Sequence, residues 1–139
     1  MNRRYRPTVT APDGRTYRGR WPQDLGTNGE APYIKALAAQ VRGVPEVVLP
    51  AGRADVATST TVFEVEPAKS WRTGAQQAFA YAGMTGLAPA LALFGEADWL
   101  SLYLRIRDRM MPLALWRWSY GAWELVSSRR IASTKAGAA

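Results

Sequence analysis

The chain has 139 residues, of which 47% are hydrophobic, enough for one domain with its own core. It contains no cysteine and no histidine, which excludes disulfides, thiolate or imidazole metal sites, and mechanisms that need a His base. Catalysis must therefore come from carboxylates, Lys, Tyr, hydroxyls or a metal. Because Asp and Glu are the only strong ligands, that metal is expected to be Mg²⁺ or Mn²⁺.

The 18 Lys and Arg against 11 Asp and Glu give a net charge of +7, which favours polyanionic partners such as DNA. No stretch resembles a signal peptide or a membrane span, so we expect a cytoplasmic protein without a membrane partner. The composition is rich in Ala and Arg, which suggests a GC-rich genome and hence a protein of a bacterial or phage-infected host cell.

Residues 1–26 are predicted to form a basic hairpin or arm. The first twenty residues hold six arginines and a single acid, and a Pro-Asp-Gly turn at 12–14 separates two short β-like runs. Such a hairpin could follow a phosphate backbone, or it could be a solvated edge. The sequence supports both interpretations equally.

Residues 27–126 are predicted to form one α/β domain with a mixed sheet. Runs with a helical period alternate with short runs of β-forming residues, and proline or glycine ends most of them. The expected order is helix, three-stranded meander, helix, strand, helix and hairpin. Helices are predicted at 28–42, 73–82 and 99–110, strands at 46–49, 53–57, 61–66, 90–94, 113–118 and 122–125, and a disordered tail at 127–139.

Capping signals mark the expected helix starts. Thr27 with Glu30 has the spacing of a capping box, although the early Pro32 allows the first helix to begin a few residues later. Thr73 and Asp98 can cap the second and third helices. The expected ends of the first two helices are Gly43 and Gly83.

Three acids in the meander are placed as for a metal site. Side chains alternate along a strand, so Glu64 and Glu66 project from one face while Phe63 and Val65 project from the other. A hairpin brings Asp55, on the preceding strand, near Glu64. Gathered carboxylates repel one another unless a cation lies between them, and a divalent cation held in this way activates a water molecule. The alternative is an ordinary solvent-exposed polar face.

Residues 52–56 (Gly-Arg-Ala-Asp-Val) and 62–66 (Val-Phe-Glu-Val-Glu), followed by a helix with Gln77 and Tyr81, resemble the core of the PD-(D/E)XK nuclease superfamily. The resemblance implies a restriction-endonuclease-like core of helix, meander, helix and strand, which matches the order predicted over residues 28–94. Gln77 and Tyr81 resemble the QxxxY element of RecB-like members, which helps to hold DNA. At this spacing they could also be a surface polar pair.

The resemblance also implies metal ligands. Asp55 and Glu64 would bind Mg²⁺ or Mn²⁺, with the Val65 carbonyl as a third ligand. Glu30 matches an acid of the first helix that completes the site in many members, and it could equally be only a capping residue.

Glu66 departs from the family pattern, which most often has a Lys there to orient water. Lys69 could reach back to take that role, or Glu66 could act as a base or a further ligand. An inactive member of the family would show the same departure. Arg53 and Arg72 flank the acids and could meet phosphate oxygens, although exposed arginines are common.

These observations predict a metal-dependent deoxyribonuclease that hydrolyses phosphodiester bonds. The small size favours a structure-selective enzyme, such as a homodimeric Holliday-junction resolvase or a phage recombination or repair nuclease. Trp116, Trp118 and Trp123 in the last hairpin could stack on bases, but internal packing or a dimer interface is the favoured interpretation. The alternatives are an inactive DNA-binding or assembly module on the same fold, and a small protein-interaction domain.

Overall fold

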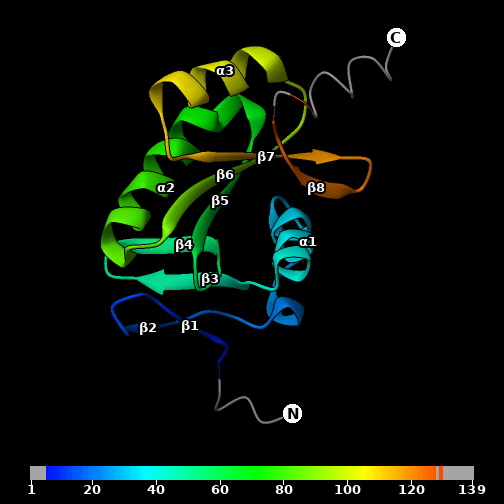
Figure 1. Ribbon diagram of the computed structural model, residues 1–139. Helices are drawn as coiled ribbons and strands as arrows, with labels where there is room; N and C mark the ends of the chain where they lie inside the picture. Colours follow the sequence, from blue (N-terminus) through cyan, green and yellow to red (C-terminus); the bar gives the residue numbers. More distant parts are fainter. Residues whose placement is uncertain (1–5, 128, 130–139) are drawn as a thin grey trace.

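The computed structural model describes residues 6–127 and 129, and Figure 1 shows a twisted sheet with helices on both sides and a small hairpin at one end. The predicted order of helix, three strands, helix, strand, helix and hairpin is confirmed, and the domain is α/β with a mixed sheet. Apart from residues 127 and 129, the predicted disordered tail lies outside the described residues.

The elements have the following bounds. The helices are α1 (Ala31–Val41), α2 (Trp71–Thr85) and α3 (Trp99–Arg109), with short 3-10 helices η1 (Pro22–Asp24) and η2 (Ala68–Ser70). The N-terminal hairpin consists of β1 (Thr8–Thr10) and β2 (Thr16–Arg18). The large sheet contains β3 (Val44–Leu49), β4 (Gly52–Ala57), β5 (Thr61–Pro67), β6 (Ala88–Phe94), β7 (Ala114–Ser119) and β8 (Ala122–Leu125).

The six strands of the large sheet follow one another in chain order. The pairs β3–β4, β4–β5 and β7–β8 are antiparallel, whereas β6 is parallel to both β5 and β7. Each parallel connection requires a crossover, which α2 and α3 provide. The meander thus forms one half of the sheet, and two β–α–β units form the other.

The core lies on both faces of the sheet. On one face, Leu37 of α1 packs with Phe63 and Val65 of β5. On the other, Leu91 and Leu93 of β6 pack with α2 and α3, and Figure 1 shows α1 apart from these two helices. Burial on both faces explains why β6 is an unbroken apolar run in the sequence.

The first helix begins later than its predicted start at residue 28. The capping box is wrong, because Glu30 occupies the N-cap position and its side chain makes no capping hydrogen bond. Pro32 lies in the first turn, where its missing N–H costs nothing. Arg42 closes the helix in the left-handed conformation, and Gly43 follows as expected.

The second helix is longer than predicted at both ends. It begins directly after η2, so Thr73 is not its cap, and it continues through Gly83 to end at Gly86, which has a φ of 75°. A glycine inside a helix costs about 1 kcal/mol, and burial of Tyr81 and Thr85 against the sheet offsets that cost. The cap of the third helix is confirmed, since Asp98 accepts a hydrogen bond from a backbone N–H in the first turn.

Aromatic packing holds the last hairpin to α1. Trp123 is 2% exposed, and its indole N–H donates to the Tyr33 carbonyl at 3.0 Å. The side chain of Gln40 bonds both the N–H and the carbonyl of Trp123, which covers the outer edge of β8. Tyr33 also stacks on Phe94 with ring centroids 3.9 Å apart. Internal packing of these aromatics is therefore confirmed.

The predicted N-terminal hairpin is present and lies against strand β3. The backbone N–H of Arg20 donates to the Pro45 carbonyl at 2.9 Å, which ties the segment after β2 to the sheet edge. Gly19 makes the close approach possible, because a Cβ there would lie 2.3 Å from a Val44 methyl group. Among the described residues, no helix is long and apolar enough to span a bilayer.

Candidate active site

The two strands that carry the predicted acids separate at the site. From the turn between them, β4 and β5 pair only as far as Val56 and Phe63. Beyond that point the acids bridge the gap: the Asp55 N–H donates to Glu64 Oε2 at 3.0 Å, and the Val65 N–H donates to Asp55 Oδ2 at 2.8 Å. The predicted closeness of Asp55 and Glu64 is confirmed, and each carboxylate replaces a strand-to-strand hydrogen bond.

Both carboxylates resist ionisation in the metal-free protein. Burial and, after it, the charge of Asp55 raise the pKa of Glu64 to about 9. Burial and the charges of three nearby glutamates raise the pKa of Asp55 to about 7, against the lowering effect of the Val65 N–H. A divalent cation between the two side chains would relieve this desolvation and repulsion.

Glu30 lies at the entrance to the site. Together with Glu46, Arg53 and Asp55 it lines a cavity of about 280 Å³ between the start of α1 and the β3–β4 pair. Burial raises the pKa of Glu30, whose charge in turn disfavours ionisation of Asp55. The structure thus places Glu30 beside the acid pair.

Glu66 lies next to α2, near enough to the acid pair for its charge to raise the pKa of Asp55 and of Glu64. A Cβ at Gly74 would lie 2.8 Å from Glu66 Cγ, so this helix glycine allows the close approach. Burial raises the pKa of Glu66, and the charge of Glu30 adds to the rise. Phe63 and Val65 pack on the α1 side, so Glu64 and Glu66 project from the opposite face, as predicted. Asp55 lines the α1-side cavity, yet the three acids are close enough to interact electrostatically.

A metal ion would have to be held by the acid pair. Within residues 6–127 and 129, no three acidic side chains are close enough as they stand to hold a cation. The donor chemistry of Asp55 and Glu64 nevertheless fits Mg²⁺ or Mn²⁺, since both are buried carboxylates with raised pKa values. The Val65 carbonyl, the predicted third ligand, belongs to the same strand segment.

Lys69 is not at the acid pair in this structure. It lies on η2, exposed, and lines a separate cavity of about 200 Å³ with Phe94 and Glu96. Pro67 ends β5 and turns the chain before Lys69, which is why three residues of separation do not bring the ammonium back to Glu66.

Gln77 and Tyr81 lie on α2, as predicted, but Tyr81 is 9% exposed and belongs to the core. Its ring lies over the start of β4, since a Cβ at Gly52 would lie 2.4 Å from the Tyr81 hydroxyl. Gln77 is half-buried one turn earlier. Tyr81 therefore supports the strand that carries Asp55, and the predicted contact of this pair with DNA is untested.

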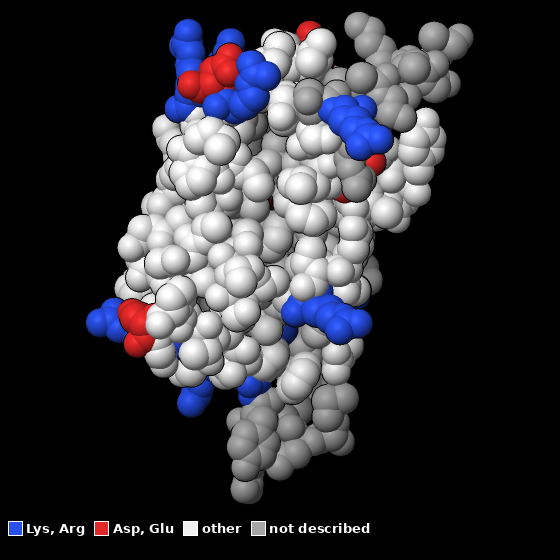
Figure 2. All heavy atoms as spheres, in the orientation of Figure 1, with Lys and Arg blue, Asp and Glu red and all other residues white. Residues whose placement is uncertain are grey.

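Arg53 and Arg72 have different surroundings. Arg53 lines the acid cavity and pairs with Glu46, its Nη2 lying 3.2 Å from Glu46 Oε2. The guanidinium of Arg72 lies over the Trp71 ring, 4.5 Å from its centroid, at the start of α2. Among the described residues on the face seen in Figure 2, basic side chains form separate groups, one of them over α3, with uncharged surface between them.

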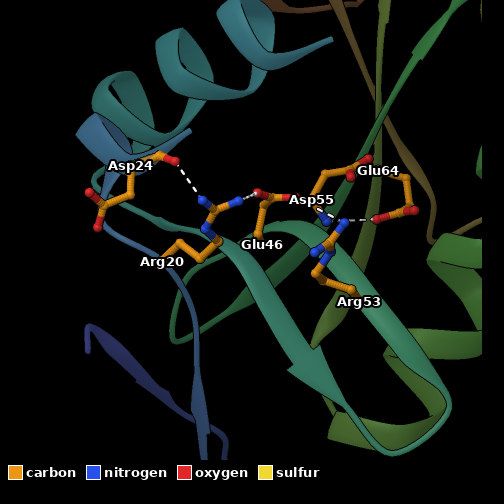
Figure 3. Close-up of polar contacts among 6 residues, drawn as sticks. All are labelled: Arg20, Asp24, Glu46, Arg53, Asp55 and Glu64. Atoms are coloured by element: carbon orange, nitrogen blue, oxygen red, sulfur yellow. Dashed lines mark hydrogen bonds and ion pairs between the residues drawn. The ribbon is translucent and has the colours of Figure 1, made fainter. Parts of the chain in front are cut away.

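Sequence reasoning missed Glu46 and Arg20. Glu46 accepts from Arg20 Nη1 at 2.8 Å, and Figure 3 shows this pair joined through Glu46 to Arg53 beside the two acids. The structure has a two-residue turn after Leu49, which sets residue 46 opposite residue 55, whereas the predicted strands at 46–49 and 53–57 would set it opposite residue 56.

No family model, curated protein or solved structure matches this chain.

Proposed function

We propose that the chain is a metal-dependent deoxyribonuclease of the PD-(D/E)XK type, with Asp55 and Glu64 as the residues that hold the metal. The observation that carries this proposal is the buried acid pair in the gap between β4 and β5. Buried carboxylates with raised pKa values are costly to stability, and such costs concentrate at functional sites.

The order of elements around the pair supports the same proposal. The segment from α1 through β3, β4 and β5 to α2 and β6 has the order helix, meander, helix and strand, which is the order expected for a restriction-endonuclease-like core. The pair lies in the middle of this segment, on β4 and β5, the second and third strands of the meander. Fold alone does not define function, so the acid pair remains the main argument.

Each residue of the site has a proposed role. A bound Mg²⁺ or Mn²⁺ would supply a hydroxide and neutralise charge on the phosphate. Asp55 and Glu64 would hold it, Glu30 would add negative charge at the entrance, and Glu66 would orient water or accept a proton from the α2 side. Arg53 would contact a phosphate oxygen.

One observation favours a second candidate, an inactive DNA-binding or assembly module on the same fold. Glu66 stands where a Lys is usual, and Lys69 faces a separate cavity. The usual lysine is absent and the ammonium of Lys69 lies elsewhere, so Glu66 would have to orient the water alone.

Cleavage assays separate these candidates. Labelled duplex, single-stranded and four-way-junction DNA would be incubated with Mn²⁺, Mg²⁺ or EDTA and with wild type, Asp55→Ala or Glu64→Ala. Asp108→Ala is the matched control, because this exposed acid pairs with Arg107 on α3. Cutting that needs metal and both site acids supports the nuclease, whereas DNA binding without any cutting supports the inactive module.

The substrate preference is also a proposal. A domain of this size suits a structure-selective enzyme that acts on DNA in the cytoplasm of a bacterial or phage-infected cell. A junction resolvase cuts two symmetric strands and would act as a homodimer. Preference for the four-way junction, together with a dimeric mass in solution, would support this assignment.

A further inference from the structure

Two arginines meet at one glutamate beside the acid cavity. Glu46 Oε1 accepts from Arg20 Nη1 at 2.8 Å, and Glu46 Oε2 lies 3.2 Å from Arg53 Nη2. Arg20 comes from the segment after the N-terminal hairpin and Arg53 from β4, so the glutamate joins two elements that are separate in the sequence. Figure 3 shows the three side chains in a row that leads to Asp55.

The glutamate is held more firmly than the arginines. The Glu46 side chain is 15% exposed, whereas those of Arg20 and Arg53 are 41% and 58% exposed. Arg20 is anchored a second time, because its Nη2 donates to the Asp24 carbonyl. A guanidinium carries five N–H donors, so each arginine keeps donors for a ligand while its position is fixed.

The backbone at Glu46 is unusual for the interior of a strand. Its φ is 50°, in the left-handed region that residues with a side chain rarely adopt. In the pairing of β3 with β4, Pro45 lies opposite Val56 and Val47 opposite Ala54. Glu46 and Asp55, which lie between these pairs, are not paired. Such strain persists where the surroundings hold the residue in place, and it is common at ligand sites.

The charges suit a phosphodiester. The triad of Arg20, Glu46 and Arg53 carries a net charge of +1. Glu46 and Arg53 line the cavity that also holds Glu30 and Asp55, whereas Arg20 lines a separate cavity and reaches this one through its ion pair with Glu46. A metal ion held by the acids would bind one phosphate oxygen. The guanidinium groups of Arg20 and Arg53 would then bind other oxygens of the same stretch of nucleic-acid backbone.

On the basis of the function proposed above, we propose that Arg20 and Arg53 form a clamp for one backbone phosphate of the nucleic acid, and that Glu46 is the residue that positions both. Glu46 does not itself touch the phosphate. Its carboxylate separates and orients two like charges that would otherwise repel each other.

The proposal predicts an effect opposite to that of simple charge. Removing a negative charge near DNA should strengthen binding, whereas removing the residue that positions the clamp should weaken it. Glu46→Gln is therefore compared with Asp13→Asn, which removes an exposed acid that pairs with Arg15 at 3.5 Å. Dissociation constants for labelled duplex DNA are measured in EDTA over a range of salt. Urea unfolding of each variant confirms that it is folded under these conditions.

We expect Glu46→Gln to weaken binding by about tenfold, as for loss of a charge-assisted contact, and Asp13→Asn to leave it unchanged or tighter. Glu46→Asp keeps the charge but is too short to reach both arginines, so it should also weaken binding. The two arginines hold one phosphate, so Arg20→Ala and Arg53→Ala should each lower the slope of log K against log salt, and the two substitutions together should lower it by about 0.9.

Binding by Glu46→Gln as tight as that of Asp13→Asn would overturn the clamp, as would unchanged slopes for both arginine variants. The nuclease is judged separately, by cleavage that depends on Asp55. A protein whose DNA binding depends on the triad but which cuts nothing keeps the clamp and loses the proposed nuclease. One that cuts DNA with no effect at Glu46 loses the clamp alone.

Discussion

Glu64→Gln should stabilise the metal-free protein at high pH while removing activity. The folded-state pKa of Glu64 is raised to about 9 from an ordinary 4.5. A raised carboxyl pKa means that the folded state binds more protons than the unfolded state, so stability is full below about pH 4 and falls as pH rises towards 9. Glutamine has the same shape, stays neutral and can still accept the Asp55 N–H.

The size of the effect follows from the burial of the pair. One unit of pKa corresponds to about 1.4 kcal/mol, and pH 5 to 8 lies inside the window between the ordinary and raised values for Glu64. The pKa of Asp55 is raised to about 7, so Asp55 titrates in the same range. The repulsion between Asp55 and Glu64 contributes to both shifts and is counted once. We expect Glu64→Gln to match wild type at pH 5 and to exceed it by on the order of 3 kcal/mol at pH 8.

The assay is urea unfolding in EDTA at pH 5, 6.5 and 8. Asp108→Asn is the control, because replacing this exposed acid should change the free energy of unfolding little at any of these pH values. Addition of Mn²⁺ at pH 8 should stabilise wild type and not Glu64→Gln, since only the folded carboxylate pair would bind the ion. Wild-type stability that rises relative to the variant between pH 5 and 8 would refute the reasoning.

Three further predictions concern the scaffold, each measured by urea unfolding. Gly52→Ala should destabilise the fold by about 1–3 kcal/mol through overpacking, because the new Cβ would lie 2.4 Å from the Tyr81 hydroxyl, and Tyr81→Phe should recover part of the loss; a neutral Gly52→Ala would contradict the contact. Gln40→Ala should cost about 1–3 kcal/mol by freeing the N–H and carbonyl of Trp123, and unchanged stability would show that this edge needs no cover. Asp98→Ala should cost about 1 kcal/mol as the loss of a helix cap, whereas Asp98→Asn should cost much less.

The order of elements and the meeting of Asp55 with Glu64 could be predicted from the sequence. Both depend on local signals: the period of apolar residues, the turn residues, and the register of a hairpin. The position of Glu46 opposite Asp55 could not be predicted in the same way, because the predicted strands leave three residues in a turn where the structure has two. The left-handed backbone of Glu46 could not be predicted either, because nothing in the residue type requires it.

The errors lie where tertiary packing overrides a local signal. Gly83 would end an isolated helix, but the buried face of α2 continues past it to Gly86. Thr27 and Glu30 have capping spacing, yet α1 begins too late for the box to form. The strands separate beside Asp55 because its side chain takes the Val65 N–H, a choice that depends on three-dimensional context.

The most direct test of the account is parallel measurement of Mn²⁺ binding and DNA cleavage for wild type, Asp55→Ala, Glu64→Gln and Asp108→Ala. The account predicts that wild type and Asp108→Ala bind Mn²⁺ and cut DNA, and that both site variants lose binding and cutting together. Cleavage that survives in either site variant, or Mn²⁺ binding that neither substitution weakens, would contradict the assignment of the acid pair as the metal site.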